Sequence, residues 1–201
     1  MKSSLKNMIM VLASICVVTS AALGFVYQLT AEPIRLAQEN KLVSALSQVL
    51  PEFNNNPLET KQNVSVEVDG EQIETIVYVA EKDGEAGGYA ITSKALGFSG
   101  DIELMTGFDK RGKIVNIQVL SMAETPGLGA NMTNEDNVLL TSFKDKEAGK
   151  INMKVKKDGG DIDALTASTI SSRAYANAVN RAYQAFLKVS ATQQGEGGEN
   201  E

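Results

Sequence analysis

The hydrophobic and polar positions of this 201-residue chain begin with a long apolar run. No charged side chain occurs in residues 7–31, and residues 8–29 consist mainly of Val, Ile, Leu, Met and Ala. About 20 such residues in a helix span the hydrocarbon core of a bilayer, roughly 30 Å thick. The run is longer than the core of a typical signal peptide, which favours an uncleaved anchor over a cleaved signal.

Basic residues around the apolar run predict its orientation. Lys2 and Lys6 precede it, while the opposite charges of Glu32 and Arg35 after it roughly cancel. By the positive-inside rule, residues 1–31 form a cytoplasmic tip and transmembrane anchor, and the rest lies on the extracytoplasmic (periplasmic) side of the cell membrane. Cys16 fits a small apolar position in the membrane helix better than a lipidation site.

Residues 32–60 are predicted to form a stalk helix and a loop. Pro33 suits the first turn of a helix, and apolar residues recur at near-helical spacing until Pro51. The Asn-rich segment that ends at Pro57 is typical of a loop.

From residue 61 the period changes to two, which predicts β-strands. Alternating or β-branched runs occupy residues 64–68, 73–80, 88–93, 102–108 and 114–120. Glycine-containing turns at residues 69–70, 82–84 and 109–112 favour hairpins, hence an antiparallel sheet.

Helical spacing returns over residues 171–189, before a Gly-, Gln- and Glu-rich end. The predicted fold class is therefore α+β, a twisted antiparallel sheet with packed helices over residues 61–190. Residues 191–201 are expected to be a disordered tail.

Composition excludes several kinds of chemistry. The chain has no His, no Trp and one Cys, so it lacks the residues of a Ser-His-Asp or Cys-His relay, a conventional zinc site, a His-ligated haem or a disulfide framework. The net charge is -6, and beyond residue 31 there are 17 basic against 25 acidic residues. No basic patch is present, which argues against a nucleic-acid partner.

The first segment with chemical content is residues 124–129, E-T-P-G-L-G. Its two glycines permit close approach of backbone amides to a planar or phosphorylated ligand, with Glu124 and Thr125 as polar contacts. A plain turn at the end of a strand is the alternative interpretation.

The second segment precedes the C-terminal helix. Five of the seven residues 166–172 carry hydroxyl groups. They suit helix capping, and they also suit a phosphate, because a helix N-terminus carries partial positive charge. A Ca²⁺ loop formed by Asp158, Asp161 and Asp163 is less favoured, since it lacks the further ligands of an EF-hand.

These segments together resemble a known family. Residues 166–171, T-A-S-T-I-S, with Asp163 six positions before Thr169, resemble the flavinylation motif of FMN-binding domains. Residues 124–129 resemble the second signature of that family, and residues 97–103 resemble its Gly-Tyr-Gly-Gly-x-Ile segment. Ala167 stands where Gly is commoner, Ser168 where Ala is commoner, and Met122 where His is frequent.

The resemblance implies a covalent cofactor. In that family a flavin transferase, using Mg²⁺ and FAD, esterifies FMN through its phosphate to the final Thr of the motif, here Thr169. Asp163 would then be recognised by the transferase. The residues expected near the cofactor are Thr166, Ala167, Ser168, Ser171, Glu124, Thr125, Gly127 and Leu128.

The resemblance also implies a function. The plan is shared by the G subunits of Rnf electron-transport complexes and the C subunits of Na⁺-translocating NADH:quinone reductases, and the short stalk-to-sheet connection here favours the former. The resemblance therefore implies that this chain is a membrane-anchored electron carrier in an ion-translocating ferredoxin:NAD⁺ oxidoreductase. Its expected partners are the other Rnf subunits, some of which are membrane-embedded. We do not expect it to be an enzyme alone, because neither a dinucleotide-binding glycine pattern nor a Cys cluster occurs.

Three alternatives remain at this point. They are the C-type component of a Na⁺-translocating quinone reductase, another anchored extracytoplasmic FMN carrier, and an adhesion or scaffold domain whose hydroxyl cluster only caps a helix.

Overall fold

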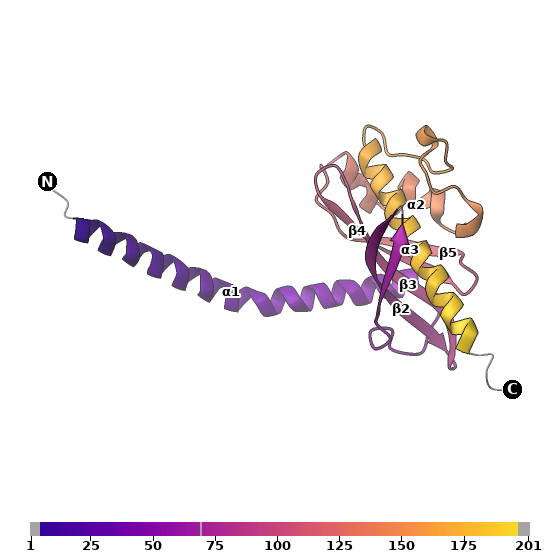
Figure 1. Ribbon diagram of the computed structural model, residues 1–201, viewed down its shortest axis with the longest axis horizontal. Helices are drawn as coiled ribbons and strands as arrows, with labels where there is room; N and C mark the ends of the chain where they lie inside the picture. Colours follow the sequence, from indigo (N-terminus) through magenta and orange to yellow (C-terminus); the bar gives the residue numbers. More distant parts are fainter. Residues whose placement is uncertain (1–4, 69, 197–201) are drawn as a thin grey trace. The chain divides into compact units, whose positions relative to one another are not determined.

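The computed structural model describes residues 5–68 and 70–196, and the chain divides into two compact units after Leu42. Figure 1 shows the course of the chain. Its elements are α1 (Leu5–Val49), β1 (Gln62–Val68), β2 (Glu71–Lys82), β3 (Glu85–Leu96), β4 (Asp101–Asp109), β5 (Ile114–Ser121), the 3₁₀ turn η1 (Gly129–Thr133), α2 (Val138–Phe143), the 3₁₀ turns η2 (Ala148–Lys150) and η3 (Lys156–Asp158), and α3 (Thr169–Glu196).

Helix α1 is long and apolar enough to cross a membrane. The residues of the predicted stalk helix are helical up to Val49, and they continue the apolar part of α1 through Pro33 without a break. Proline has no amide hydrogen, so the carbonyl of Leu29 loses its helical partner there. The helix tolerates this loss because apolar and helix-forming residues continue on both sides of Pro33.

The five strands form one antiparallel sheet in the order β1-β2-β3-β4-β5. Each strand pairs with its neighbours in sequence, which confirms the predicted antiparallel sheet. Gly70, Gly84 and Gly112 have φ values between 81° and 85°, as tight hairpin turns require. Asp69, part of the first predicted turn, lies outside the described residues.

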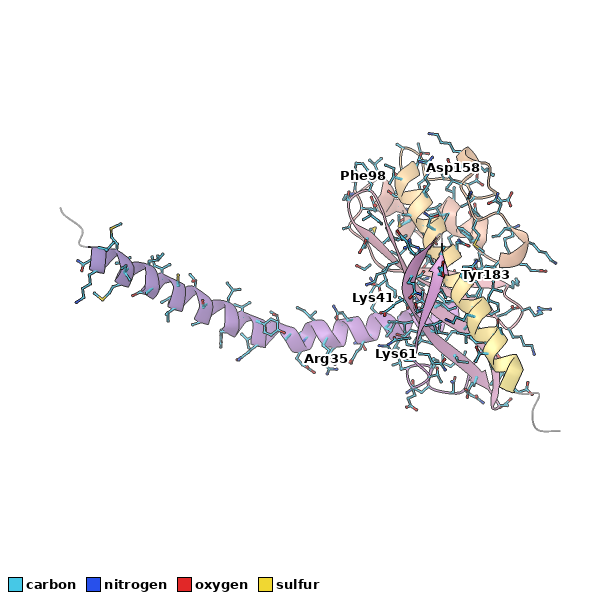
Figure 2. The ribbon with its side chains drawn as sticks, viewed as in Figure 1. Arg35, Lys41, Lys61, Phe98, Asp158 and Tyr183 are labelled. Carbon is cyan, nitrogen blue, oxygen red and sulfur yellow. The ribbon has the colours of Figure 1, made fainter. Side chains whose placement is uncertain are left out.

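Helix α3 packs across one face of the sheet and supplies much of the core (Figure 1). Tyr89 and Phe108 on the sheet contact Phe186 on the helix, with ring centroids 5.4 and 5.2 Å apart. Figure 2 shows the side chains of the domain, with Tyr183 on α3. Ser93 Oγ donates a hydrogen bond of 2.8 Å to the carbonyl of Ala178, which ties β3 to the helix.

The C-terminal helix is longer at both ends than residues 171–189. It begins at Thr169 and continues to Glu196, so the first six residues of the predicted disordered tail are helical. No proline interrupts these residues, and the helix already anchored on the sheet simply extends through them. Residues 197–201 of that predicted tail lie outside the described residues.

The opposite face of the sheet is covered by the last turns of α1, within the second compact unit. A Cβ atom on Gly107 of β4 would lie 1.8 Å from the carbonyl oxygen of Val49, so the helix end rests directly on the strand. Asn116 Nδ2 also donates to the carbonyl of Gln48 at 3.1 Å. Leu46 and Val49 are buried. The end of the predicted stalk is therefore part of the domain's core.

Candidate functional site: a pocket at the start of α3

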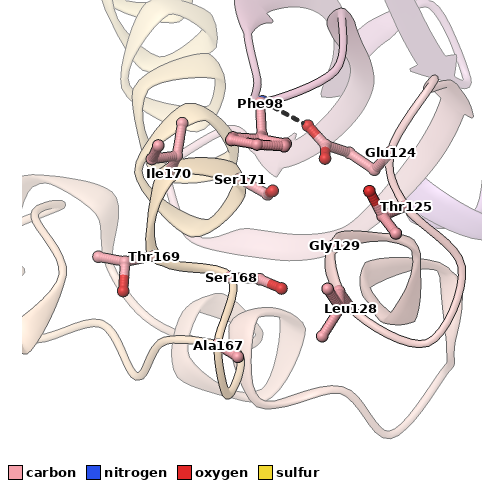
Figure 3. Close-up of a pocket in the computed structure, with 10 residues that line it drawn as sticks. All are labelled: Phe98, Glu124, Thr125, Leu128, Gly129, Ala167, Ser168, Thr169, Ile170 and Ser171. Atoms are coloured by element: carbon pink, nitrogen blue, oxygen red, sulfur yellow. Dashed lines mark hydrogen bonds between the residues drawn. The ribbon is translucent and has the colours of Figure 1, made fainter.

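A pocket of about 320 Å³ lies where three segments meet (Figure 3). The segments are the β3–β4 turn, the loop after β5 and the first turn of α3. The lining residues are Phe98, Glu124, Thr125, Leu128, Gly129, Ala167, Ser168, Thr169, Ile170 and Ser171. The structure thus brings the two chemically suggestive segments of the sequence to one place. Thr166, Gly127 and Asp163, also expected near the cofactor or its transferase, are not among the lining residues.

The first turn of α3 presents unpaired hydrogen-bond donors. The amide of Ser172 is the first to bond into the helix, donating to the carbonyl of Ser168 at 2.9 Å. Within residues 5–68 and 70–196, the amides of Thr169, Ile170 and Ser171 meet no acceptor. No hydroxyl of the motif caps them, so capping does not account for the cluster. Free amides at a helix N-terminus favour an anion.

Ser168 adds a further unpaired group. Its side chain is buried, and its Oγ has no hydrogen-bond partner among the described residues. In Figure 3 this hydroxyl is turned towards Leu128, on the pocket side of the chain. A buried polar atom without a partner costs free energy, so a ligand that accepts or donates a hydrogen bond there is stabilised.

Thr169 lies on the other side of the turn. Its side chain is half-buried, and in Figure 3 its hydroxyl points away from Glu124 and Leu128. Its Oγ1 makes no hydrogen bond to any residue that the structure describes. The hydroxyl is therefore available for reaction.

The backbone before Thr169 is held in an unusual turn. Ala167 has φ 59°, in the left-handed region that glycine adopts most readily, which explains why glycine is commoner at this motif position. Ser172 stabilises this turn through two hydrogen bonds. Its Oγ accepts from the amide of Leu165 at 3.0 Å and donates to the carbonyl of Ser168 at 2.9 Å. Sequence reasoning counted Ser172 only as a member of the hydroxyl cluster.

Some backbone amides of the loop at residues 124–129 are bonded within the loop. The amides of Leu128 and Ala130 both donate to the carbonyl of Thr125, so the loop uses them internally. Gly127 has φ 76° and lies in an exposed turn. Among the described residues the amides of Gly127 and Gly129 meet no acceptor, and Gly129 lines the pocket, so the loop offers donors in addition to those of α3.

Glu124 lines the pocket, and its direct contact with a ligand stays a prediction. Its side chain is buried, and its Oε1 accepts a hydrogen bond of 2.6 Å from the amide of Phe98. Phe98, Gly129 and Ile170 line the pocket but were not predicted site residues. The aromatic residue inside the Gly97–Gly100 turn was the available signal for Phe98, and Figure 2 shows Phe98 at the tip of this hairpin.

The rim of the pocket is apolar. Phe98, Ile170 and Leu128 are 69%, 48% and 41% exposed. Exposed apolar side chains gathered at one pocket suit a flat, largely apolar ligand.

The three aspartates before the motif have separate partners. Asp158 binds Arg173 through both carboxylate oxygens at 2.6 and 2.7 Å, and this guanidinium holds the pKa of Asp158 below its usual value. Asp161 accepts from the amide of Asn152, and Lys156 Nζ lies 2.7 and 2.8 Å from the two oxygens of Asp163. They do not form a common Ca²⁺ ligand set, and among the described residues no group of three His, Cys, Asp or Glu is arranged for a metal ion.

Comparison with known proteins assigns the pocket to a known domain family. The FMN-binding domain family matches residues 97–184, a range that contains every residue lining the pocket. The G subunit of the ion-translocating oxidoreductase complex from Vibrio parahaemolyticus is 36% identical over 174 residues, which cover 84% of this chain and 82% of that protein. The chain belongs to this family of G subunits. The corresponding G subunit of Haemophilus influenzae is 33% identical over 182 residues, covering 85% and 83% of the two chains.

This member of the G-subunit family also has similar solved structures. The C subunit of the Na⁺-translocating NADH-quinone reductase from Parabacteroides distasonis aligns with a TM-score of 0.47 and 22% identity, covering 65% of this chain and 78% of that one. NqrC from Shewanella oneidensis aligns with a TM-score of 0.43 and 18% identity, covering 68% and 71%. Membership of the G-subunit family confirms the resemblance drawn from the motifs.

Proposed function

We propose that this chain is the FMN-bearing electron carrier subunit of an Rnf-type ion-translocating oxidoreductase complex, with FMN joined through its phosphate to Thr169. The observation that carries the proposal is the start of α3. Three unpaired amides and the orphaned Ser168 Oγ lie beside a free threonine hydroxyl, inside a matched FMN-binding domain.

The residues present fit the two halves of FMN. The amides of Thr169, Ile170 and Ser171 are donors for phosphate oxygens, and the positive end of the α3 dipole favours their negative charge. Phe98, Leu128 and Ile170 offer apolar surface of the kind that a flat ring system requires. Bound FMN supplies the ability to accept and donate electrons.

Attachment at Thr169 requires only the chemistry of a hydroxyl. The Thr169 oxygen bonds to the phosphorus of FMN in FAD, the phosphoanhydride bond breaks with AMP as leaving group, and the hydroxyl proton is released. A flavin transferase with Mg²⁺ would perform this step, with Asp163 as part of the segment that it recognises. The half-buried, outward-facing Thr169 hydroxyl supports such access.

We also propose that the FMN domain lies on the extracytoplasmic side of the membrane, near the membrane-embedded subunits. Lys2 and Lys6 before the apolar part of α1 support a cytoplasmic N-terminus. A covalent link would keep the cofactor in place outside the compartment that produces it.

The attachment is tested by intact mass and visible absorbance of the full chain, purified in detergent from a host that contains the flavin transferase. The wild type should gain the mass of FMN less one water and be yellow. Thr169→Ala should lose both properties, whereas Thr169→Ser, which keeps a hydroxyl, should retain some modification. A colourless, unmodified wild type, beside a flavinylated relative from the same host, would contradict the proposal.

A further inference from the structure

Glu124 carries a buried carboxylate at the point where two loops meet. Its Oε1 accepts from the Phe98 amide at 2.6 Å, although the two residues are 26 positions apart in the chain (Figure 3). Hydrogen bonds to ionised groups at such distances are among the stronger ones in proteins. Among the described residues, no Lys or Arg forms an ion pair with Glu124. The structure thus gives this carboxylate a backbone donor from the neighbouring hairpin.

Two glycines make room for the Glu124 carboxylate. A Cβ atom on Gly97, in the β3–β4 hairpin, would lie 2.1 Å from Oε1. A Cβ atom on Gly129, at the start of η1, would lie 2.8 Å from Oε2. A side chain at Gly97 would displace the carboxylate, and one at Gly129 would crowd both the carboxylate and Ser171 Oγ, which would lie 2.6 Å away.

Burial does not hold the Phe98 ring in place. The residue is 69% exposed, while its amide is bonded to Glu124. The turn around it is closed by the amide of Gly97, which donates to the carbonyl of Gly100 at 2.9 Å. The hydrogen bond from the Phe98 amide to Glu124 therefore connects this small turn to the loop on the other side of the pocket.

We propose that Glu124 is a positioning residue: by holding the Phe98 amide, it keeps the Phe98 ring at the mouth of the pocket that would hold the flavin. This inference rests on the proposed function for the identity of the occupant. It assigns Glu124 an action through Phe98 in place of the direct ligand contact that the sequence suggested.

The hydrogen bond is tested first in the full chain without FMN, purified in detergent from a host that lacks the flavin transferase. Exchange of the Phe98 amide with deuterium, followed by nuclear magnetic resonance, should be slow in the wild type. Glu124→Ala should accelerate it by about tenfold or more, because the charged acceptor is lost. Glu124→Gln keeps an oxygen acceptor and should preserve much of the protection, and Asp101→Asn, on the exposed start of β4, should leave it unchanged.

The effect on the cofactor is tested in the flavinylated full chain by quenching of flavin fluorescence with acrylamide. Phe98→Ala and Glu124→Ala should each raise the quenching constant by the same factor, and the double variant should raise it no further. Glu124→Gln should restore a value near the wild type, which general destabilisation would not produce. Gly97→Ala, which displaces the carboxylate without removing it, should behave like Glu124→Ala.

Two results would overturn the assignment. One is rapid exchange of the Phe98 amide in the wild type. The other is a further increase in quenching when Glu124→Ala is added to Phe98→Ala, since Glu124 would then act on the flavin independently of Phe98. A wild type without FMN would overturn the proposed function and, with it, the claim that Phe98 acts on the flavin. Amide exchange would still decide whether Glu124 holds the Phe98 amide.

Discussion

Single backbone conformations determine what the site can bind. Ala167 adopts a left-handed conformation directly before Ser168, whose hydroxyl lies on the pocket side of the chain in Figure 3. The next three amides belong to the first turn of α3, where helix geometry leaves them without a partner among the described residues. Ser172 stabilises the turn at Ala167 through its two hydrogen bonds. The phosphate binding that we propose therefore rests on backbone amides, because no Lys or Arg is among the residues that line the pocket.

The effect of a substitution at Ala167 on the unfolding free energy should depend on how readily the new residue adopts the left-handed conformation. Ala167→Gly relieves a strain of roughly 1–2 kcal/mol, of which the greater freedom of glycine in the unfolded chain offsets about 0.4–1 kcal/mol. The net expectation is a small stabilisation. Ala167→Val should instead destabilise the domain by about 1 kcal/mol or more, because a β-branched residue is disfavoured at positive φ.

Denaturant unfolding of the full chain without FMN, followed by tyrosine fluorescence, measures these changes. The stability order should be Gly, then Ala, then Val at position 167. A Val variant as stable as the Gly variant would contradict the left-handed conformation of this residue.

At the scale of elements, α1 has two roles along its length. Its apolar part is fully exposed and suited to a bilayer, while its last turns lie on the back of the sheet. Leu46 is 2% exposed and Leu36 is 45% exposed, although both belong to the same helix. The boundary between anchor and domain therefore falls inside a helix.

Leu46→Ala should cost about 2–5 kcal/mol of unfolding free energy, as truncation of a buried leucine does. Leu36→Ala should change it by no more than about 0.5 kcal/mol, because that side chain is already exposed. The unfolding midpoint of the full chain in detergent measures both variants. Equal effects would show that the end of α1 does not belong to the domain core.

At the scale of the whole molecule, the absence of His shapes the response to pH. No side chain with an ordinary pKa between about 5 and 8 is present, so the stability of the domain should be nearly constant over that range. Below pH 5, the stability of the domain should depend on the protonation of carboxylates that form ion pairs. Lys113 beside Asp145 and Arg173 beside Asp158 lower the pKa of both acids.

A carboxyl group with a lowered folded-state pKa stabilises the fold above its unfolded pKa of about 3.9. That stabilisation should be lost as the pH falls through the lowered value. Asp158→Asn should remove part of this acid dependence, whereas Asp101→Asn, at a side chain with no ion pair in the described structure, should not. Unfolding midpoints between pH 2 and 7 test this, and an unchanged acid dependence in Asp158→Asn would contradict it.

The amino-acid sequence alone determined the apolar anchor, the five strands with their turns, the C-terminal helix and the family. These features are local: hydrophobic periodicity, turn glycines and short motifs lie within a few residues of one another. The family signatures at residues 124–129 and 163–171 are visible in the amino-acid sequence itself. Only their chemical roles remained open.

Tertiary structure decided how those segments act. The bond between Glu124 and Phe98 joins residues 26 positions apart, and the contact of Val49 with β4 joins α1 to a strand far along the chain. The turn before α3 depends on the φ of Ala167, which no periodicity encodes. Such features arise from long-range packing and backbone dihedral angles, because only the folded chain brings the donors, the orphaned hydroxyl and the apolar rim into one pocket.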